Sequence, residues 1–527
     1  MAPSQLLPAL LTGLALAATA AEQATRPNIL VLTLEDVSAH EIGCYGNAAV
    51  RTPNMDALAA NGVQYLRAWS TGAQCSPARS CLITGGYATT WGMDLHRGRI
   101  AVPEGLHYTL PLRQAGYFCS NDSKNDFNSH GDDGIWDVCP RGASPASRKR
   151  RPDQPFLAVV NSMSTHMGSV IGSEDRSPVR AATTVGMSPP PPHVPDLPEL
   201  RADQQRHFTA IEKADAWVGE QITRLHQAGH AEDTVVILFS DHGGCVPRGK
   251  GFPFETGLRV PFIVHAPPRW QHLLTEPPGT RSQRLIGFIN VGPTLLSLAG
   301  LKPPPSMQGR AFLGPHAVEP PRYQFGFVSN SGDHFVPART VTDGRFTYIR
   351  WYTPWLPNAL RNFYQWRMDG NRAWDRWVLE GGDRADWLQP YRPRPGEQLF
   401  AVESDPWQMH DLANDPNHAK ILHDLRKAIA DHIRDSGDLG FWPRGLRHGG
   451  PVEDRWGQEI SGGKPFIERV MAEDGLLADV HAAADLASDG NPAAIERMQT
   501  LLKNPQPVLR FWGACGLAHV ARRGLLA

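Results

Sequence analysis

The chain has 527 residues, which is long enough for two or three domains with large cores, since a single core rarely grows beyond about 250–300 residues. Its 52 Lys and Arg and 53 Asp and Glu give a net charge of −1, which excludes a general affinity for nucleic acid or anionic membrane. Hydrophobic residues make up 41% and charged residues 20%, a balance that excludes wholesale disorder.

Residues 1–21, MAPSQLLPALLTGLALAATAA, predict a signal peptide with a small-residue cleavage site at Ala18-Thr19-Ala20. The stretch before the apolar run has no Lys or Arg, so a short buried or disordered N-terminus stays open as the alternative. No later segment reaches the roughly 18 uninterrupted apolar residues of a membrane span. We therefore expect a periplasmic or secreted protein.

Short apolar runs that end in polar residues alternate with helical patterns through the first 310 residues. The expected strands are 26–36, 155–166, 233–244 and 259–267, and the expected helices are 52–69 and 206–229. This alternation predicts an α/β fold, a doubly wound and mostly parallel mixed sheet flanked by helices. We assign residues 22–310 to this α/β domain.

The remaining chain predicts a smaller C-terminal part. Asp343-Gly344 separates two β-rich runs in 339–352 and predicts a hairpin, and 414–435 is expected to be a helix. We therefore expect an α+β subdomain with a small antiparallel sheet over 311–440. The Ala- and Leu-rich tail, 441–527, resembles helical repeat pairs of the HEAT type, which are too few to be stable alone and should dock on the main body.

Two pairs of polar residues follow apolar strands: Glu35-Asp36 and Asp241-His242. Adjacent acids at the end of a buried strand are costly unless a cation neutralises them. A single pair is more simply explained by helix capping and solvation. Two such pairs, on strands that can lie side by side, favour a divalent metal held mostly by oxygen.

Cys75 lies in the unusual segment AQCSPARSCLITG, four residues before Arg79. Lys124, His166 and Lys250 fall on further loops at strand ends, where α/β sheets assemble their sites. Each of these residues alone is more simply a surface lysine or a core histidine. Together with a metal they predict a site that neutralises an anionic ester while a nucleophile attacks it. The seven cysteines are an odd number, and a Cys119–Cys139 disulfide stays open.

The segment Cys75-Ser76-Pro77-Ala78-Arg79 resembles the C-x-P-x-R signature of type I sulfatases in the alkaline phosphatase superfamily. The blocks SDHG, GLRVPFIVHAP and QLFAVESDPWQMHDLANDP are similar to later blocks of that family, so the resemblance covers about residues 26–430. The segments STHM and SKNDFN resemble the branch that contains heparan N-sulfatases and related bacterial enzymes.

The resemblance implies that a maturase oxidises Cys75 to formylglycine, whose hydrated aldehyde attacks sulfur with one hydroxyl and expels sulfate with the other. It also implies the site residues. The metal ligands would be Glu35, Asp36, Cys75, Asp241 and His242, and the catalytic groups Cys75, Arg79, Lys124, His166 and Lys250. Asp126 and His334 are expected to contact substrate. The implied cation is Ca²⁺, with Mg²⁺ or Mn²⁺ as alternatives.

Three positions depart from the family pattern: Glu35 replaces the usual Asp, His242 the commonest Asn, and Asp126 a frequent His. We expect a sulfuric ester hydrolase that removes O- or N-linked sulfate from a sulfated carbohydrate, for example a glycosaminoglycan. A phosphonate monoester or phosphodiester hydrolase of the same superfamily is the first alternative. A non-catalytic relative that binds sulfated glycans is the second. The sequence leaves the oligomeric state open.

Overall fold

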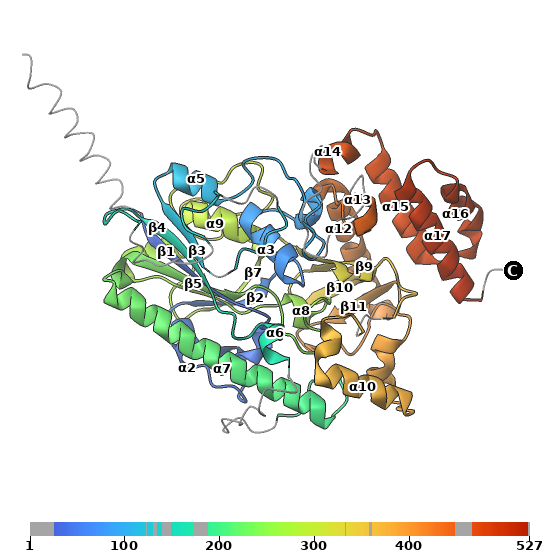
Figure 1. Cartoon of the computed structure of the whole chain (residues 1–527), viewed down its shortest axis with the longest axis horizontal. Helices are drawn as coiled ribbons and strands as arrows, with labels where there is room; N and C mark the ends of the chain where they lie inside the picture. The colour runs from blue at the N-terminus through green and yellow to red at the C-terminus, as the bar shows by residue number, and fades with distance from the viewer. Residues whose placement is uncertain are drawn as a thin grey trace, which may run out of the picture.

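The computed structural model describes residues 26–122, 124–129, 134–139, 149–171, 188–332, 334–357, 361–447 and 466–524. The expected signal peptide lies outside these residues. The described chain forms two sheets with helices around them (Figure 1). None of the described helices combines the length and the apolar character that crossing a membrane requires.

The larger sheet has seven strands in the order β3-β4-β1-β5-β6-β2-β7. They are β1 (Asn28–Leu34), β2 (Val63–Trp69), β3 (Phe118–Asp122), β4 (Phe156–Asn161), β5 (Thr234–Ser240), β6 (Phe262–His265) and β7 (Arg281–Gly287). Strand β6 runs antiparallel to β5 and β2, and the other pairs of this sheet are parallel. The predicted mixed, mostly parallel sheet is confirmed.

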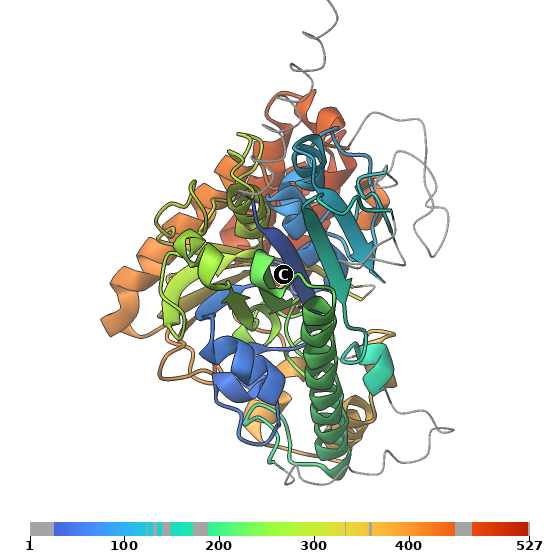
Figure 2. The ribbon, with the colours of Figure 1, turned by 90° about the vertical axis from the view of Figure 1, so that its left-hand side faces the viewer.

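Both faces of this sheet are buried, because successive residues of a strand point to opposite faces. In β1, Ile29 and Val31 pack in one apolar core, and Leu30 and Leu32 pack in the other. Helices α3, α5 and α9 cover the first face and α2 and α7 cover the second (Figure 1). Figure 2 shows α2 in blue beside the long green α7.

The helices of the described chain have the following bounds. They are α2 (Pro53–Ala60), α3 (Cys75–Thr84), α4 (Ala88–Trp91), α5 (Thr109–Gln114), α6 (Met167–Val170), α7 (Pro198–Gln227), α8 (Glu255–Leu258), α9 (Val291–Leu298), α10 (Asp369–Leu379), α11 (Ala385–Leu388), α12 (Ala419–Ser436), α13 (Arg444–Arg447), α14 (Phe466–Met471), α15 (Leu476–Asp489), α16 (Ile495–Leu502) and α17 (Pro507–Arg522). Helix α7 confirms the expected helix over 206–229 but begins earlier, with a proline in its first turn.

The helix expected over 52–69 is wrong in its second half. Helix α2 ends at Ala60, and Val63–Trp69 is strand β2 between β6 and β7. The break lies at Gly62, where a Cβ atom would come 2.4 Å from the carbonyl oxygen of Val264. Only glycine permits this close approach of two backbones, and the strand beyond it completes the sheet.

The second sheet is antiparallel, in the order β11-β10-β9-β8. Its strands are β8 (Gln324–Ser331), β9 (His334–Thr342), β10 (Phe346–Trp351) and β11 (Glu397–Ala401). The predicted hairpin is confirmed: Thr342 pairs with Thr347, and Gly344 has a φ of 88°, which glycine adopts without strain. Helix α12 confirms the helix expected over 414–435.

Helices α14 to α17 form the tail, which Figure 1 shows in red beside the second sheet. The Arg522 guanidinium donates to the carbonyl of Trp355 over 3.0 Å, and the rings of Phe335 and Phe511 lie 5.9 Å apart. The tail therefore docks on the main body, as expected. Cys119 and Cys139, both among the described residues, are not joined by a disulfide.

Candidate active site

The two polar pairs meet at one edge of the larger sheet. Strands β1 and β5 are parallel neighbours with Leu34 opposite Ser240, so the residues after them emerge side by side. The backbone N–H of Asp36 donates to the Asp241 carboxylate over 3.1 Å. Glu35, Asp36, Asp241 and His242 are all fully buried. The register of the sheet alone brings together pairs that are more than 200 residues apart in sequence.

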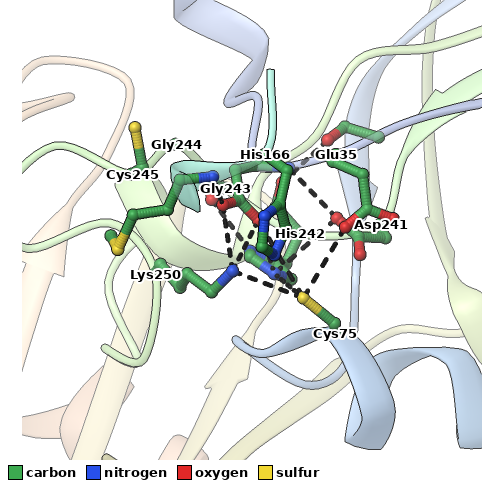
Figure 3. A network of polar contacts seen from close by, with 12 residues as sticks. Glu35, Cys75, His166, Asp241, His242, Gly243, Gly244, Cys245 and Lys250 are labelled. Atoms are coloured by element: carbon green, nitrogen blue, oxygen red, sulfur yellow. Dashed lines mark hydrogen bonds and ion pairs between the residues drawn. The ribbon is translucent and has the colours of Figure 1, made fainter. Parts of the chain in front are cut away.

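Cys75 is the first residue of α3, where the helix begins against these carboxylates (Figure 3). Its Sγ lies 3.2 Å from His242 Nε2, 3.4 Å from Lys250 Nζ and 3.8 Å from Glu35 Oε2. Burial raises the pKa of the thiol, but the charges of Lys250 and Lys124 outweigh it and lower the pKa to about 5. Residue 75 therefore lies at the centre of the cluster as an acidic thiol next to two cations and a carboxylate.

Three cations hold the three carboxylates. The Arg79 guanidinium contacts Glu35 and lies 3.2 Å from Asp241, because one turn of α3 separates it from Cys75. Lys124 Nζ lies 2.9 Å from Glu35, and Lys250 Nζ lies 2.9 Å from Asp36. Each of these side chains is nearly or fully buried, so each charge acts in a medium that screens it weakly.

The cluster also contains donor atoms for a cation. Asp36, Cys75, Asp241 and His242 each offer one ligand atom, and these atoms lie within 4.8 Å of one another. Glu35, Cys75 and His166 form an overlapping group. The His242 Nδ1 contacts the Gly243 carbonyl at 2.9 Å, which leaves Nε2 facing the cluster. The residues present fit a buried divalent metal with oxygen and nitrogen ligands.

The pKa values show crowded negative charge. Burial, and then Asp241, raise the pKa of Glu35 to about 7. Burial lowers the pKa of His242, but Asp241, Cys75 and Asp36 outweigh it and raise that pKa well above its ordinary value. Carboxylates that compete in this way for the nearby positive charge are stabilised by an added cation.

His166 is the N-terminal cap of α6, and its Nδ1 accepts a hydrogen bond from Gly168 N–H over 3.2 Å. In the neutral ring the proton is therefore on Nε2. The ring is half-buried, whereas the metal-ligand candidates are fully buried. The structure thus places a histidine N–H donor at the edge of the cluster.

The two expected substrate contacts lie in different places. Asp126 Oδ2 is 3.6 Å from Lys124 Nζ, at the margin of the cluster. His334 is the exposed first residue of β9, opposite Ser331. Ser331 in turn faces Gly251, the neighbour of Lys250, because a Cβ at Gly251 would lie 3.1 Å from its Oγ. Among the contacts of the described residues, His334 has none with the cluster itself.

Several residues near the cluster were not predicted from the sequence. Gln365 Nε2 donates to the carbonyl of Lys250 over 2.7 Å, and the Tyr364 ring centroid lies 5.9 Å from Lys250 Nζ. Asn161 accepts a hydrogen bond of 2.9 Å from Arg79. Only the aromatic segment 363–366 and the polar end of the strand 155–166 marked these positions in the sequence.

A buried pair supports the loops that carry the ligands. Glu41 Oε1 lies 3.3 Å from His207 Nε2, and Cys245 Sγ lies 3.4 Å from His207 Nδ1. Burial lowers the pKa of His207, but Cys245 and Glu41 outweigh it and raise that pKa well above its ordinary value. The loops after β1 and β5 are therefore tied to α7 by a charged contact in the interior.

A nucleophilic residue at a helix N-terminus, three buried cations and a metal-binding cluster together define an active site for an anionic ester. The family model described as Sulfatase matches residues 27–138 and 142–301. The chain belongs to the sulfatase family and is a sulfuric ester hydrolase.

The comparisons with individual proteins agree with this assignment. The chain is 30% identical over 462 residues to an ulvan-active sulfatase of Formosa agariphila, covering 78% of this chain and 76% of the relative. It is 25% identical to N-sulphoglucosamine sulphohydrolase of Homo sapiens, covering 77% and 89%. The solved structure of a 2-O GAG sulfatase has a TM-score of 0.57, with 17% identity and coverage of 78% and 93%, and shows the shared fold, which is that of alkaline phosphatase.

Proposed function

We propose that this sulfatase removes sulfate from a sulfated saccharide, with formylglycine made from Cys75 and a divalent cation, most simply Ca²⁺. The observation that carries the proposal is the position of Cys75. Its Sγ lies among His242, Lys250 and Glu35, and a C-x-P-x-R segment surrounds it. The names of the relatives, an ulvan-active sulfatase and a sulphoglucosamine sulphohydrolase, support a saccharide substrate.

Asp36, Asp241, His242 and residue 75, with Glu35 beside them, would hold the cation. When bound, the cation supplies positive charge next to the transferred sulfate. The hydrated aldehyde supplies one hydroxyl for attack on sulfur and a second for the release of sulfate. The overall reaction is hydrolysis: the bond from sulfur to the alcohol oxygen breaks, and water provides the new oxygen and the protons.

The side chains of the site divide this task among them. Arg79 and Lys124 fix Glu35 beside residue 75 and hold the reactive form of that residue. Lys250, 3.4 Å from the Cys75 Sγ, places its charge where negative charge gathers in the transition state. His166 offers its Nε2–H to the oxygen that leaves. Asp126 and His334 remain proposed contacts to the substrate.

We also propose that residues 1–21 direct export, and that the chain divides into parts 22–310, 311–440 and 441–527. Residues 1–21 lie outside the described structure, so this proposal depends on their apolar run and cleavage motif. The division is supported by the second sheet, which lies between Gln324 and Ala401, and by helices α14 to α17.

Mass spectrometry of the peptide that contains Cys75, from a host with a maturase, tests the catalytic proposal. We expect an aldehyde at residue 75 in active protein, and an intact thiol in active protein would contradict it. Parallel assays with aryl sulfates, aryl phosphonate monoesters and aryl phosphodiesters separate the two ester classes. A preference for phosphorus esters by orders of magnitude in kcat/KM would favour the superfamily alternative. Binding of sulfated glycan without turnover, by protein that carries the aldehyde, would favour the non-catalytic alternative.

A further inference from the structure

A strained turn lies beside the reactive residue. Arg97 has a φ of 53°, in the left-handed region that residues with a Cβ rarely adopt. Its backbone N–H donates over 2.7 Å to the Oγ of Ser76, the residue after Cys75. The backbone N–H of His96 donates over 2.9 Å to Asn330 Oδ1. The turn is therefore held in its conformation by contacts to α3 and to β8.

The Arg97 side chain is exposed. No carboxylate of the described residues lies within 4.0 Å of its guanidinium. Its positive charge nevertheless acts on two groups at the margin of the site, Asp126 beside Lys124 and Tyr364 beside Lys250. It helps to lower the pKa of Asp126, after Lys124 and His96, against the effect of burial. It also acts on the phenol of Tyr364. Arg97 thus places a positive charge close enough to Asp126 and Tyr364 to act on both, and it forms no ion pair with a carboxylate of the described residues.

Tyr364 lies beside two of the expected catalytic side chains, Lys250 and His166. Its half-buried ring lies 5.9 Å from Lys250 Nζ and 6.2 Å from the ring of His166, measured to the centroid. The Arg367 guanidinium carbon lies 5.8 Å from the same centroid. An aromatic face beside charged donors is the usual composition of a site for a polar ring-shaped ligand.

We propose that Arg97, with Tyr364 beside it, recognises a second anionic group on the saccharide, a carboxylate or another sulfate near the sulfate that is removed. This inference rests on the proposed function. A guanidinium pairs with either anion through two parallel N–H bonds. A saccharide whose only negative group is the sulfate to be removed would leave Arg97 in water, so the contact selects a substrate that carries two negative groups. Arg97 is a specificity residue and takes no part in the bond changes.

Binding measurements test the subsite without turnover. The protein made without a maturase, with the Cys75 thiol intact, is titrated calorimetrically with three disaccharides. The first joins 6-O-sulfated glucosamine to glucuronate, the second is its uronate methyl ester, and the third is that ester with an added sulfate. We expect Arg97→Gln to weaken binding of the first or third about tenfold, the size of one charged hydrogen bond, and of the ester less than twofold. The affected ligand identifies the anion.

Two variants complete the test. Arg97→Lys should bind more tightly than Arg97→Gln because it keeps the positive charge. Neither Arg97→Gln nor Arg97→Lys adds backbone strain at the positive φ, since arginine, glutamine and lysine all carry a Cβ. Arg224→Gln removes an exposed arginine near the end of α7, beside the start of β5 and away from the site, and should change no affinity. The subsite is refuted if the protein prefers neither dianion to the ester, or if Arg97→Gln weakens all three equally or none.

Turnover of the formylglycine form provides an independent readout. Arg97→Gln should raise KM for the dianionic disaccharide about tenfold and leave kcat within about twofold, because the contact binds the ground and transition states alike. A loss confined to kcat would contradict the specificity role. If the formylglycine form without any substitution releases sulfate from no sulfate ester, the proposed function is refuted. The binding measurements would still decide whether the subsite exists.

Discussion

Replacement of Lys250 by alanine should slow catalysis far more than it weakens substrate binding. The Lys250 Nζ lies 3.4 Å from the Cys75 Sγ and 2.9 Å from both oxygens of Asp36. Burial lowers the pKa of this amine, but Asp36 and Cys75 outweigh it and raise the pKa well above its ordinary value. Lys250 therefore stays charged where the attacking and departing atoms meet.

The size of the effect follows from that distance. Two unit charges 3.4 Å apart interact by roughly 5 kcal/mol at an effective dielectric constant of about 20. Only the charge that develops during the reaction counts toward catalysis. If about half a charge develops, roughly 2.4 kcal/mol is lost, which corresponds to a kcat lower by about 60-fold, on the order of 10².

The assay is steady-state hydrolysis of aryl sulfates whose phenols cover a range of pKa values. Poor leaving groups should lose the most rate, because they depend on Lys250 to stabilise the negative oxygen. Lys213→Ala, which removes an exposed lysine of α7, is the matched control and should change nothing. The metal content of both variants is measured, because Lys250 also contacts Asp36. Equal losses for poor and good leaving groups, at equal metal content, would refute the leaving-group role.

Three further predictions concern the metal and the buried histidines. EDTA should abolish sulfate release and Ca²⁺ should restore it, with Mg²⁺ and Mn²⁺ tested beside it. Asp241→Ala should lower kcat/KM at least about 10²-fold. Metal-free protein with full rates would contradict the ligand assignment. Burial lowers the pKa of His107 to about 4, whereas its ordinary pKa is near 6.5. Between these two pH values the unfolded chain binds more protons than the folded chain. The free energy of unfolding should therefore decrease as the pH falls through this range, by at most about 3 kcal/mol. His107→Gln should flatten this pH dependence in urea unfolding, and an unchanged slope would count against it. Glu41→Gln should destabilise the protein by about 3–5 kcal/mol, because it leaves the His207 charge buried without its carboxylate, and it should also weaken metal binding. Thermal unfolding with and without Ca²⁺ measures both effects. A melting temperature and a metal affinity that both stay unchanged would exclude the supporting role of this pair.

Much of the site could be predicted from the sequence because its chemistry is local. Glu35-Asp36 and Asp241-His242 directly follow apolar strands, and the parallel register of β1 and β5 brings them together without further information. The segment around Cys75 predicted that this residue belongs to the site, and its Sγ lies 3.2 Å from His242 and 3.4 Å from Lys250. The alternation of strands and helices likewise predicted the mixed, mostly parallel sheet, because both faces of a covered sheet must be apolar.

Other features depended on tertiary contacts. The segment Val63–Trp69 has an apolar pattern that suits either a helix or a strand. It forms a strand because it pairs with β6 on one side and β7 on the other. The chain breaks at Gly62 because the backbone of Val264 comes close to it. The residues on either side of Gly62 give no indication of this contact. Short apolar runs are ambiguous when packing alone selects the structure.

The sequence by itself determined the class of reaction, sulfuric ester hydrolysis, because the residues that mark the family follow strand ends and begin a helix as local segments. Only the tertiary structure decided which residues surround the substrate. Tyr364 and Arg97 have no motif of their own and lie more than 260 residues apart, yet the charge of Arg97 acts on the phenol of Tyr364. Their placement depends on the packing of loops from different strands, which no local pattern encodes.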